Sequence, residues 1–140
     1  PPKIFLRASA VLERQFMAFC MDSWVRKGIP DDAIPDKVGI ILKKLDARPS
    51  DMFPFNFLNY VQSTLSRQIN SFVQMFSAYL DESSKEELQI FARGTGTTES
   101  SMHIKILDAF ESLKKQQNRD FRSFCSVAPA VPECRKALFP

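Results

Sequence analysis

The chain has 140 residues, of which 44% are hydrophobic and 25% are charged, and its formal net charge at pH 7 is +3. This composition excludes wholesale disorder, and the length predicts a single domain, residues 1–140, that buries its own core. The charge is too small to indicate a nucleic-acid partner. No apolar run approaches the roughly 18 residues that a membrane-spanning helix needs.

Residues 3–27 are expected to form the first helix, because apolar side chains recur every three or four positions on one face. At about 100° per residue, Leu6, Met17 and Trp24 lie on a second side of the same helix. A helix with two apolar sides is either sandwiched between neighbours or leaves one side exposed. Gly28 is well placed to end it.

A short second helix is expected over residues 36–47. Lys43 and Lys44 lie near its C-terminus, where positive charge suits the helix dipole. Three acidic residues come just before it or at its start, and we expect them to cap its free backbone N–H groups. They are Asp31, Asp32 and Asp36.

The loop over residues 49–56 is unusually apolar. Met52, Phe53 and Phe55 flank Pro54, where helical periodicity cannot assign them to a buried face. One interpretation is that these side chains pack across the core. The other is that they are exposed and insert into a membrane, which makes them the first candidates for membrane contact.

A long third helix is expected over residues 57–80. Its apolar side chains occupy one arc, and its other face carries Ser, Asn and Gln. Arg67 is the one charged residue between Met52 and Leu80. A solvent-facing helix normally carries Lys and Glu, so the pattern indicates burial against neighbours or a weakly hydrated surface.

The C-terminal third is expected to hold two more helices and a tail. Residues 84–87 have the form of a capping box that opens a helix ending near Gly94, and a longer helix follows over residues 99–125. The tail, residues 127–140, contains three prolines and is expected to be extended and clamped on the helices. The sequence therefore predicts an all-α, single-domain, up-and-down bundle of about five helices with an extended C-terminal tail.

Catalytic and metal-binding patterns are missing from the sequence. His103 is the one histidine, no cysteine lies within four residues of another, and residues 94–96 lack the sequence context of a phosphate loop. We therefore expect no enzymatic activity, no metal and no cofactor. If the chain is secreted, Cys125 and Cys134 are the expected disulfide pair, and Cys20 is expected to be a reduced, buried thiol.

Basic residues occur in pairs, among them Lys43 with Lys44 and Lys114 with Lys115. Solvated charge on helix ends is the ordinary interpretation. Large apolar residues beside Lys and Arg also favour binding to anionic lipid surfaces, through burial combined with electrostatic attraction.

The organisation of the chain resembles that of the abalone acrosomal sperm proteins, which comprise egg-coat lysin and its membrane-fusing paralogue. The resemblance covers most of the chain. It rests on Pro2-Lys3 before a long first helix, Trp24-Val25-Arg26 and Gly28 at its end, a short second helix, an aromatic-rich helix around Asn59-Tyr60, and a last helix followed by a Pro-containing tail.

Membership of that family would imply a five-helix bundle, secretion from the sperm acrosomal vesicle and non-enzymatic action on the egg. Lysins are strongly basic, whereas this chain has a charge of +3, carries cysteines and is rich in Phe. In these respects the chain is more similar to the fusagenic paralogue than to lysin. The resemblance therefore implies a protein that promotes fusion of sperm and egg membranes, with an anionic membrane, and an egg surface protein or a second copy of itself, as partners.

The alternative hypothesis is a helical interaction module that buries an apolar patch in a protein partner or a homodimer. The membrane hypothesis names ten contact residues: Met52, Phe53, Phe55, Leu6, Met17, Trp24, Lys43, Lys44, Lys114 and Lys115.

Overall fold

The computed structural model describes residues 9–93, 100–116 and 121–138. These residues form eight α-helices and two short 3-10 turns and contain no strand, so the all-α prediction is confirmed. The helices are α2 (Ser9–Arg26), α3 (Val38–Lys44), α4 (Phe55–Ser63), α5 (Leu65–Met75), α6 (Glu82–Arg93), α7 (Ser101–Gln116), α8 (Phe121–Val127) and α9 (Pro132–Leu138), and the 3-10 turns span Leu45–Ala47 and Ser77–Tyr79.

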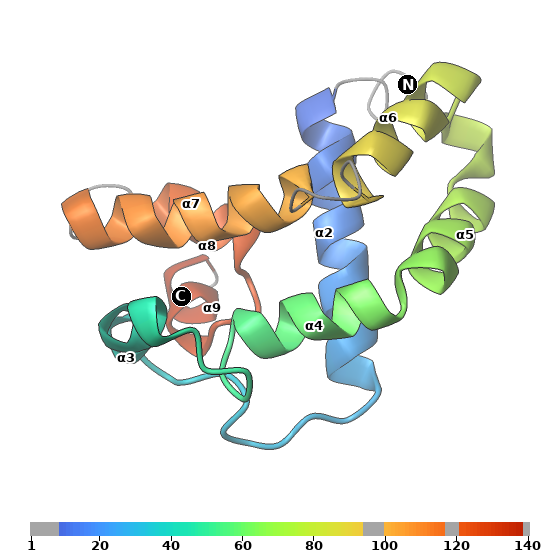
Figure 1. The fold of residues 1–140 in the computed structure, drawn as a ribbon. Helices are drawn as coiled ribbons and strands as arrows, with labels where there is room; N and C mark the ends of the chain where they lie inside the picture. Colours follow the sequence, from blue (N-terminus) through green and yellow to red (C-terminus); the bar gives the residue numbers. More distant parts are fainter. Residues whose placement is uncertain (1–8, 94–99, 117–120, 139–140) are drawn as a thin grey trace.

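Helix α2 stands at the centre of the molecule. It packs against α4, α5, α6 and α8; in Figure 1, α4 runs across it and α7 extends away from it to the left. Both apolar sides of α2 are therefore covered, as the sandwiched interpretation expected. The crossing helices make the bundle less regular than a simple up-and-down arrangement. Gly28 ends α2 with φ +88°, a left-handed conformation that glycine adopts without strain.

Phenylalanine rings fill the centre of the core. Phe16, Phe53, Phe57, Phe72 and Phe110 are each fully buried. The Phe16 and Phe72 rings meet edge to face with centroids 5.3 Å apart, which joins α2 to α5. Many of the Phe side chains in this Phe-rich sequence therefore lie inside the fold.

The predicted third helix is present but broken at Thr64, which separates α4 from α5. The Thr64 hydroxyl donates to the Tyr60 carbonyl at 2.7 Å, and this local bond is of the kind that bends helices. The neutral polar face of α5, which includes Ser66, Asn70 and Gln74, is exposed. Of the two interpretations left open for that face, the structure therefore supports a surface over burial.

The fourth helix starts earlier than predicted. It begins at Glu82, and the Asp81 carboxylate accepts a hydrogen bond from the Ser84 amide at 2.8 Å. The N-cap is therefore Asp81 and not Ser84, because an aspartate three positions before the start of the expected box satisfies the free donors of the first turn.

The expectation of an extended tail is wrong for residues 132–138, which form α9. Pro132 occupies the first position of that helix, where a missing N–H has no cost. Val131 is fully buried and holds the segment against the core, whereas the Leu138 side chain and Phe139 lie outside the described part. The predicted fifth helix is represented by α7 and α8; residues 117–120 between them are not described.

Candidate functional site

The three loop side chains named as membrane contacts lie in the core. Met52, Phe53 and Phe55 are 8%, 0% and 7% exposed. The Phe53 amide and the Asn56 side-chain amide both donate to the Ala33 carbonyl, at 3.1 and 2.9 Å. These bonds fold the loop back over the core and turn its side chains inward. The expectation that they are exposed is therefore wrong.

The second set of apolar candidates is also buried. Met17 and Trp24 are 2% and 3% exposed, because α2 is covered on both of its apolar sides. Trp24 packs against Phe53 and Phe57. The expectation of an exposed patch on this helix is therefore wrong for these two residues, and Leu6 lies outside the described residues.

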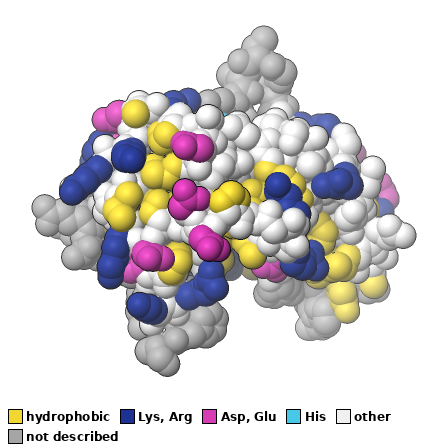
Figure 2. Space-filling model, turned by 90° about the horizontal axis from the view of Figure 1, so that it is seen from below, with side chains coloured by type: hydrophobic (Ala, Val, Ile, Leu, Met, Phe, Trp, Pro, Cys, Tyr) yellow, Lys and Arg dark blue, Asp and Glu magenta, His cyan; other side chains and the backbone are white. Residues whose placement is uncertain are grey.

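The two predicted lysine pairs lie at one end of the molecule, although 70 residues separate them. All four side chains are exposed, and Lys114 Nζ lies 3.1 Å from Asp46 Oδ2 in the 3-10 turn that follows Lys44. This contact joins the C-terminal ends of α3 and α7. We call Lys43, Lys44, Lys114 and Lys115 the lysine end. Figure 2 shows this half of the surface, on the left, with basic, acidic and apolar side chains interspersed.

The outer face of α3 combines cations with an exposed apolar side chain. Ile40 is 44% exposed, one turn from the exposed Lys43 and Lys44, and Lys37 is exposed just before the helix. No acidic residue lies within α3 itself. This short helix is therefore a small amphipathic surface of the kind that contacts lipid headgroups.

The acidic residues before α3 do not cap it as expected. The N-cap residue of α3 is Lys37, and its side chain makes no capping hydrogen bond. The Val38 amide donates instead to Glu133 Oε2 of α9, at 2.8 Å. Asp31, Asp32 and other acidic residues line a surface hollow of about 500 Å³, which Ile40 and Lys44 of α3 also line. Among the described residues no group of His, Cys, Asp or Glu has the arrangement of a metal site.

A polar network, missed by the sequence interpretation, lies at the bend between α4 and α5. Gln68 is 2% exposed, and its side-chain amide donates to the Ser23 and Tyr60 hydroxyls at 3.1 Å each and to Thr64 Oγ1 at 3.2 Å. The network joins α2, α4 and α5. Its sequence signal was a glutamine on the apolar arc of the helix, one turn from Leu65, because a buried amide requires partners.

The surroundings of the Tyr60 hydroxyl lower its pKa. Burial alone would raise the pKa of Tyr60, but hydrogen bonds with Ser23 and Gln68 and the nearby Arg67 together lower it below its ordinary value of 10.0. Lys27 Nζ lies 5.5 Å from the centre of the same ring. Lys27 and Arg67 therefore place two positive charges close to the Tyr60 side chain.

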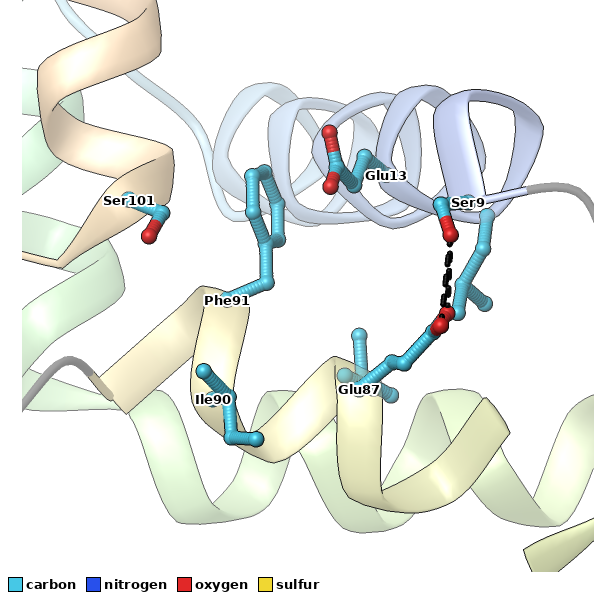
Figure 3. Close-up of a pocket in the computed structure, with 8 residues that line it drawn as sticks. Ser9, Glu13, Glu87, Ile90, Phe91 and Ser101 are labelled. Atoms are coloured by element: carbon cyan, nitrogen blue, oxygen red, sulfur yellow. Dashed lines mark hydrogen bonds between the residues drawn. The ribbon is translucent and has the colours of Figure 1, made fainter. Parts of the chain in front are cut away.

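A small pocket of about 240 Å³ opens between α2 and α6 (Figure 3). Across it, the Ser9 hydroxyl donates to the Glu87 carboxylate at 3.1 Å, while Glu13 is paired with Lys105 at 2.8 Å. Both carboxylates thus have partners, and no His, Cys or Lys is among the described residues that line the pocket. These two contacts join α2 to α6 and to α7.

The cysteine expectations are confirmed. Cys125 and Cys134 form a disulfide that joins α8 to α9, with their Cα atoms 5.1 Å apart. Cys20 is a free, buried thiol in α2. Burial raises the pKa of this thiol from its ordinary value of 9.0 to about 12, so it stays protonated and unreactive at neutral pH.

Comparison with known proteins adds no relative to this description. No family model, curated protein or solved structure matches the chain. Within the described residues, no helix is both long and apolar enough to cross a bilayer.

Proposed function

We propose that this chain is a secreted, non-enzymatic sperm protein of the acrosomal type, which promotes sperm–egg membrane fusion by attaching to anionic membranes through its lysine end. The observation that carries the proposal is the Lys114–Asp46 contact at 3.1 Å, which brings the two lysine pairs beside the amphipathic face of α3. The Cys125–Cys134 disulfide supports secretion, because disulfides persist in oxidising compartments.

The proposal assigns most of the attraction to charge. Each lysine near an anionic leaflet contributes about 1 kcal/mol. Ile40 is already more than half covered, so its burial in lipid contributes roughly 1 kcal/mol, which is a fraction of the range for a fully buried side chain. Lys114 is engaged by Asp46 and Lys44 borders the acidic hollow, which leaves Lys43 and Lys115 as the strongest contributors. Attachment is therefore weak per molecule and sensitive to salt.

Flotation with anionic vesicles tests this proposal. We expect the protein to float with phosphatidylserine vesicles at 0.1 M salt and to be released at 1 M, where the Debye length falls from about 10 Å to about 3 Å. The double variant K43Q/K115Q should lose most of this binding. A matched control, R14Q/K85Q, removes the same charge from α2 and α6 and should float like the wild type. Equal losses in both variants would refute the role of the lysine end.

A second function, protein–protein interaction, is favoured by two other side chains. Met75 of α5 and Ile90 of α6 are 63% and 66% exposed, which is unusual for such apolar residues. They suit a protein partner, such as an egg surface protein or a second copy of this chain. Light scattering after size exclusion tests the homodimer: a dimer that M75S or I90S converts to a monomer would favour this function.

A further inference from the structure

We infer that the bend between α4 and α5 is a binding site for a phosphate monoester group. The site is a surface hollow of about 460 Å³, lined by Gln62, Ser63, Thr64, Ser66 and Arg67 from the bend and by Arg93 at the end of α6. We call it the arginine hollow. It is separate from the lysine end, and the inference does not rest on the proposed function.

The charges that line the arginine hollow are all of one sign. Arg67 and Arg93 contribute two guanidinium groups, and no carboxylate is among its described lining residues. Within the described part of the chain, neither arginine takes part in an ion pair.

The hydrogen bonds within the hollow leave donors available for an anion. Arg93 is held by two bonds, from Nε to Gln89 Oε1 at 2.6 Å and from a terminal nitrogen to Ser66 Oγ at 3.2 Å. Since Ser66 accepts this bond, its own hydrogen is free to donate to a ligand. The Ser63 and Thr64 hydroxyls instead donate to the Tyr60 carbonyl, so they shape the floor of the hollow.

The chemistry of these donors selects the ligand. Guanidinium groups match the oxygens of a phosphate with paired hydrogen bonds. A phosphate monoester carries about −1.5 to −2 charges at pH 7, which balances two arginines, whereas a phosphodiester carries one. The free phosphate ion and the headgroup of phosphatidic acid both carry such a doubly ionisable phosphate, and the vesicle experiment separates these two sources.

Nuclear magnetic resonance of the whole protein tests the inference, with inorganic phosphate as the probe. We expect saturable shifts of the Nε–Hε signals of Arg67 and Arg93 in the wild type, and of the backbone amide signals of Ser63, Thr64 and Ser66, which report the affinity for phosphate in every variant. Affinity should fall at least tenfold in R67Q/R93Q. The control R14Q/R135Q removes two exposed arginines elsewhere and should change affinity less than twofold. The variant R67K/R93K keeps both charges but loses the planar donors, so it should bind more weakly than the wild type. Circular dichroism verifies that each variant is folded.

Vesicles identify the source of the phosphate. If the ligand is a headgroup, binding to phosphatidic acid vesicles should fall tenfold in R67Q/R93Q, while binding to phosphatidylglycerol vesicles of equal surface charge should not. If the ligand is the free ion, inorganic phosphate should shift the arginine signals of the wild type, and R67Q/R93Q should bind vesicles as well as the wild type does. The inference is overturned if neither probe depends on Arg67 and Arg93, or if the control variant weakens binding equally. K43Q/K115Q should retain the phosphate response, so failure of the proposed function is distinguishable from failure here.

Discussion

The Phe53 ring stacks on Trp24 with ring centroids 5.9 Å apart and an angle of 26° between their planes. This contact joins the apolar loop to the second apolar side of α2. The apolar loop and the second apolar side of α2, which both suggested insertion into a membrane, therefore cover each other in the core.

Replacing Phe53 with Ser should destabilise the fold. Loss of a fully buried Phe typically costs about 3–5 kcal/mol, because a cavity remains. We expect a loss of that size in urea unfolding, whereas M75S, at a 63% exposed position, should change the free energy of unfolding by less than about 0.5 kcal/mol. A stable F53S protein would mean that the ring is not core.

Glu133 should stabilise α3 across the fold. Its carboxylate accepts the hydrogen bond of the Val38 amide at 2.8 Å, which is the function of an N-cap. Loss of a cap typically costs about 0.5–2 kcal/mol. We expect E133A to lower the free energy of unfolding by this amount and to increase hydrogen exchange at Val38. The neighbouring exposed change K136A should leave exchange at Val38 as it is in the wild type.

The three cysteines should react in a fixed order. In the native protein at pH 8, iodoacetamide should label none within minutes, because Cys20 is buried and its thiol pKa is raised to about 12. Denaturant without reductant should expose one cysteine, and reduction should expose all three. Mass spectrometry counts the labels. Three labels without reduction would contradict the Cys125–Cys134 disulfide.

Tyr60 should titrate below its ordinary pKa, and Arg67 should be part of the reason. Folding favours the ionised phenol, so this contribution to stability is present above pH 10.0 and is lost as the pH falls through the folded pKa. Ultraviolet titration, with Y60F to assign the signal, should show a rise in the Tyr60 pKa in R67Q. An unchanged pKa in R67Q would show that Arg67 does not act on this hydroxyl.

Helical periodicity was sufficient to predict the helix class and most helix positions. It identified the first helix, the short second helix and the long apolar third helix, because each buries a face that repeats every three or four residues. It could not predict α9, a seven-residue helix held by the Cys125–Cys134 disulfide and a proline start. Such short segments depend on tertiary contacts more than on local pattern.

The candidate site was also predicted only in part from the sequence. The lysine pairs were visible in the sequence, since charge at helix ends is a local property, but their meeting at Asp46 was not. The burial of Phe53 depends on a hydrogen bond between its amide and Ala33, which no periodic pattern contains. Arg67 and Arg93 come from different helices, and only the packing of α5 on α6 places them in one hollow.

The most direct test of the central claim asks which part of the protein touches the membrane. Two fluorescent reporters are compared in vesicles of brominated anionic lipid: Trp24, the one tryptophan, and a label on the I40C variant. We expect the lipid to quench the label at position 40 strongly and Trp24 hardly at all, because Ile40 is 44% exposed beside the lysines and Trp24 is 3% exposed in the core. Strong quenching of Trp24 with an unquenched label at position 40 would contradict attachment through the lysine end.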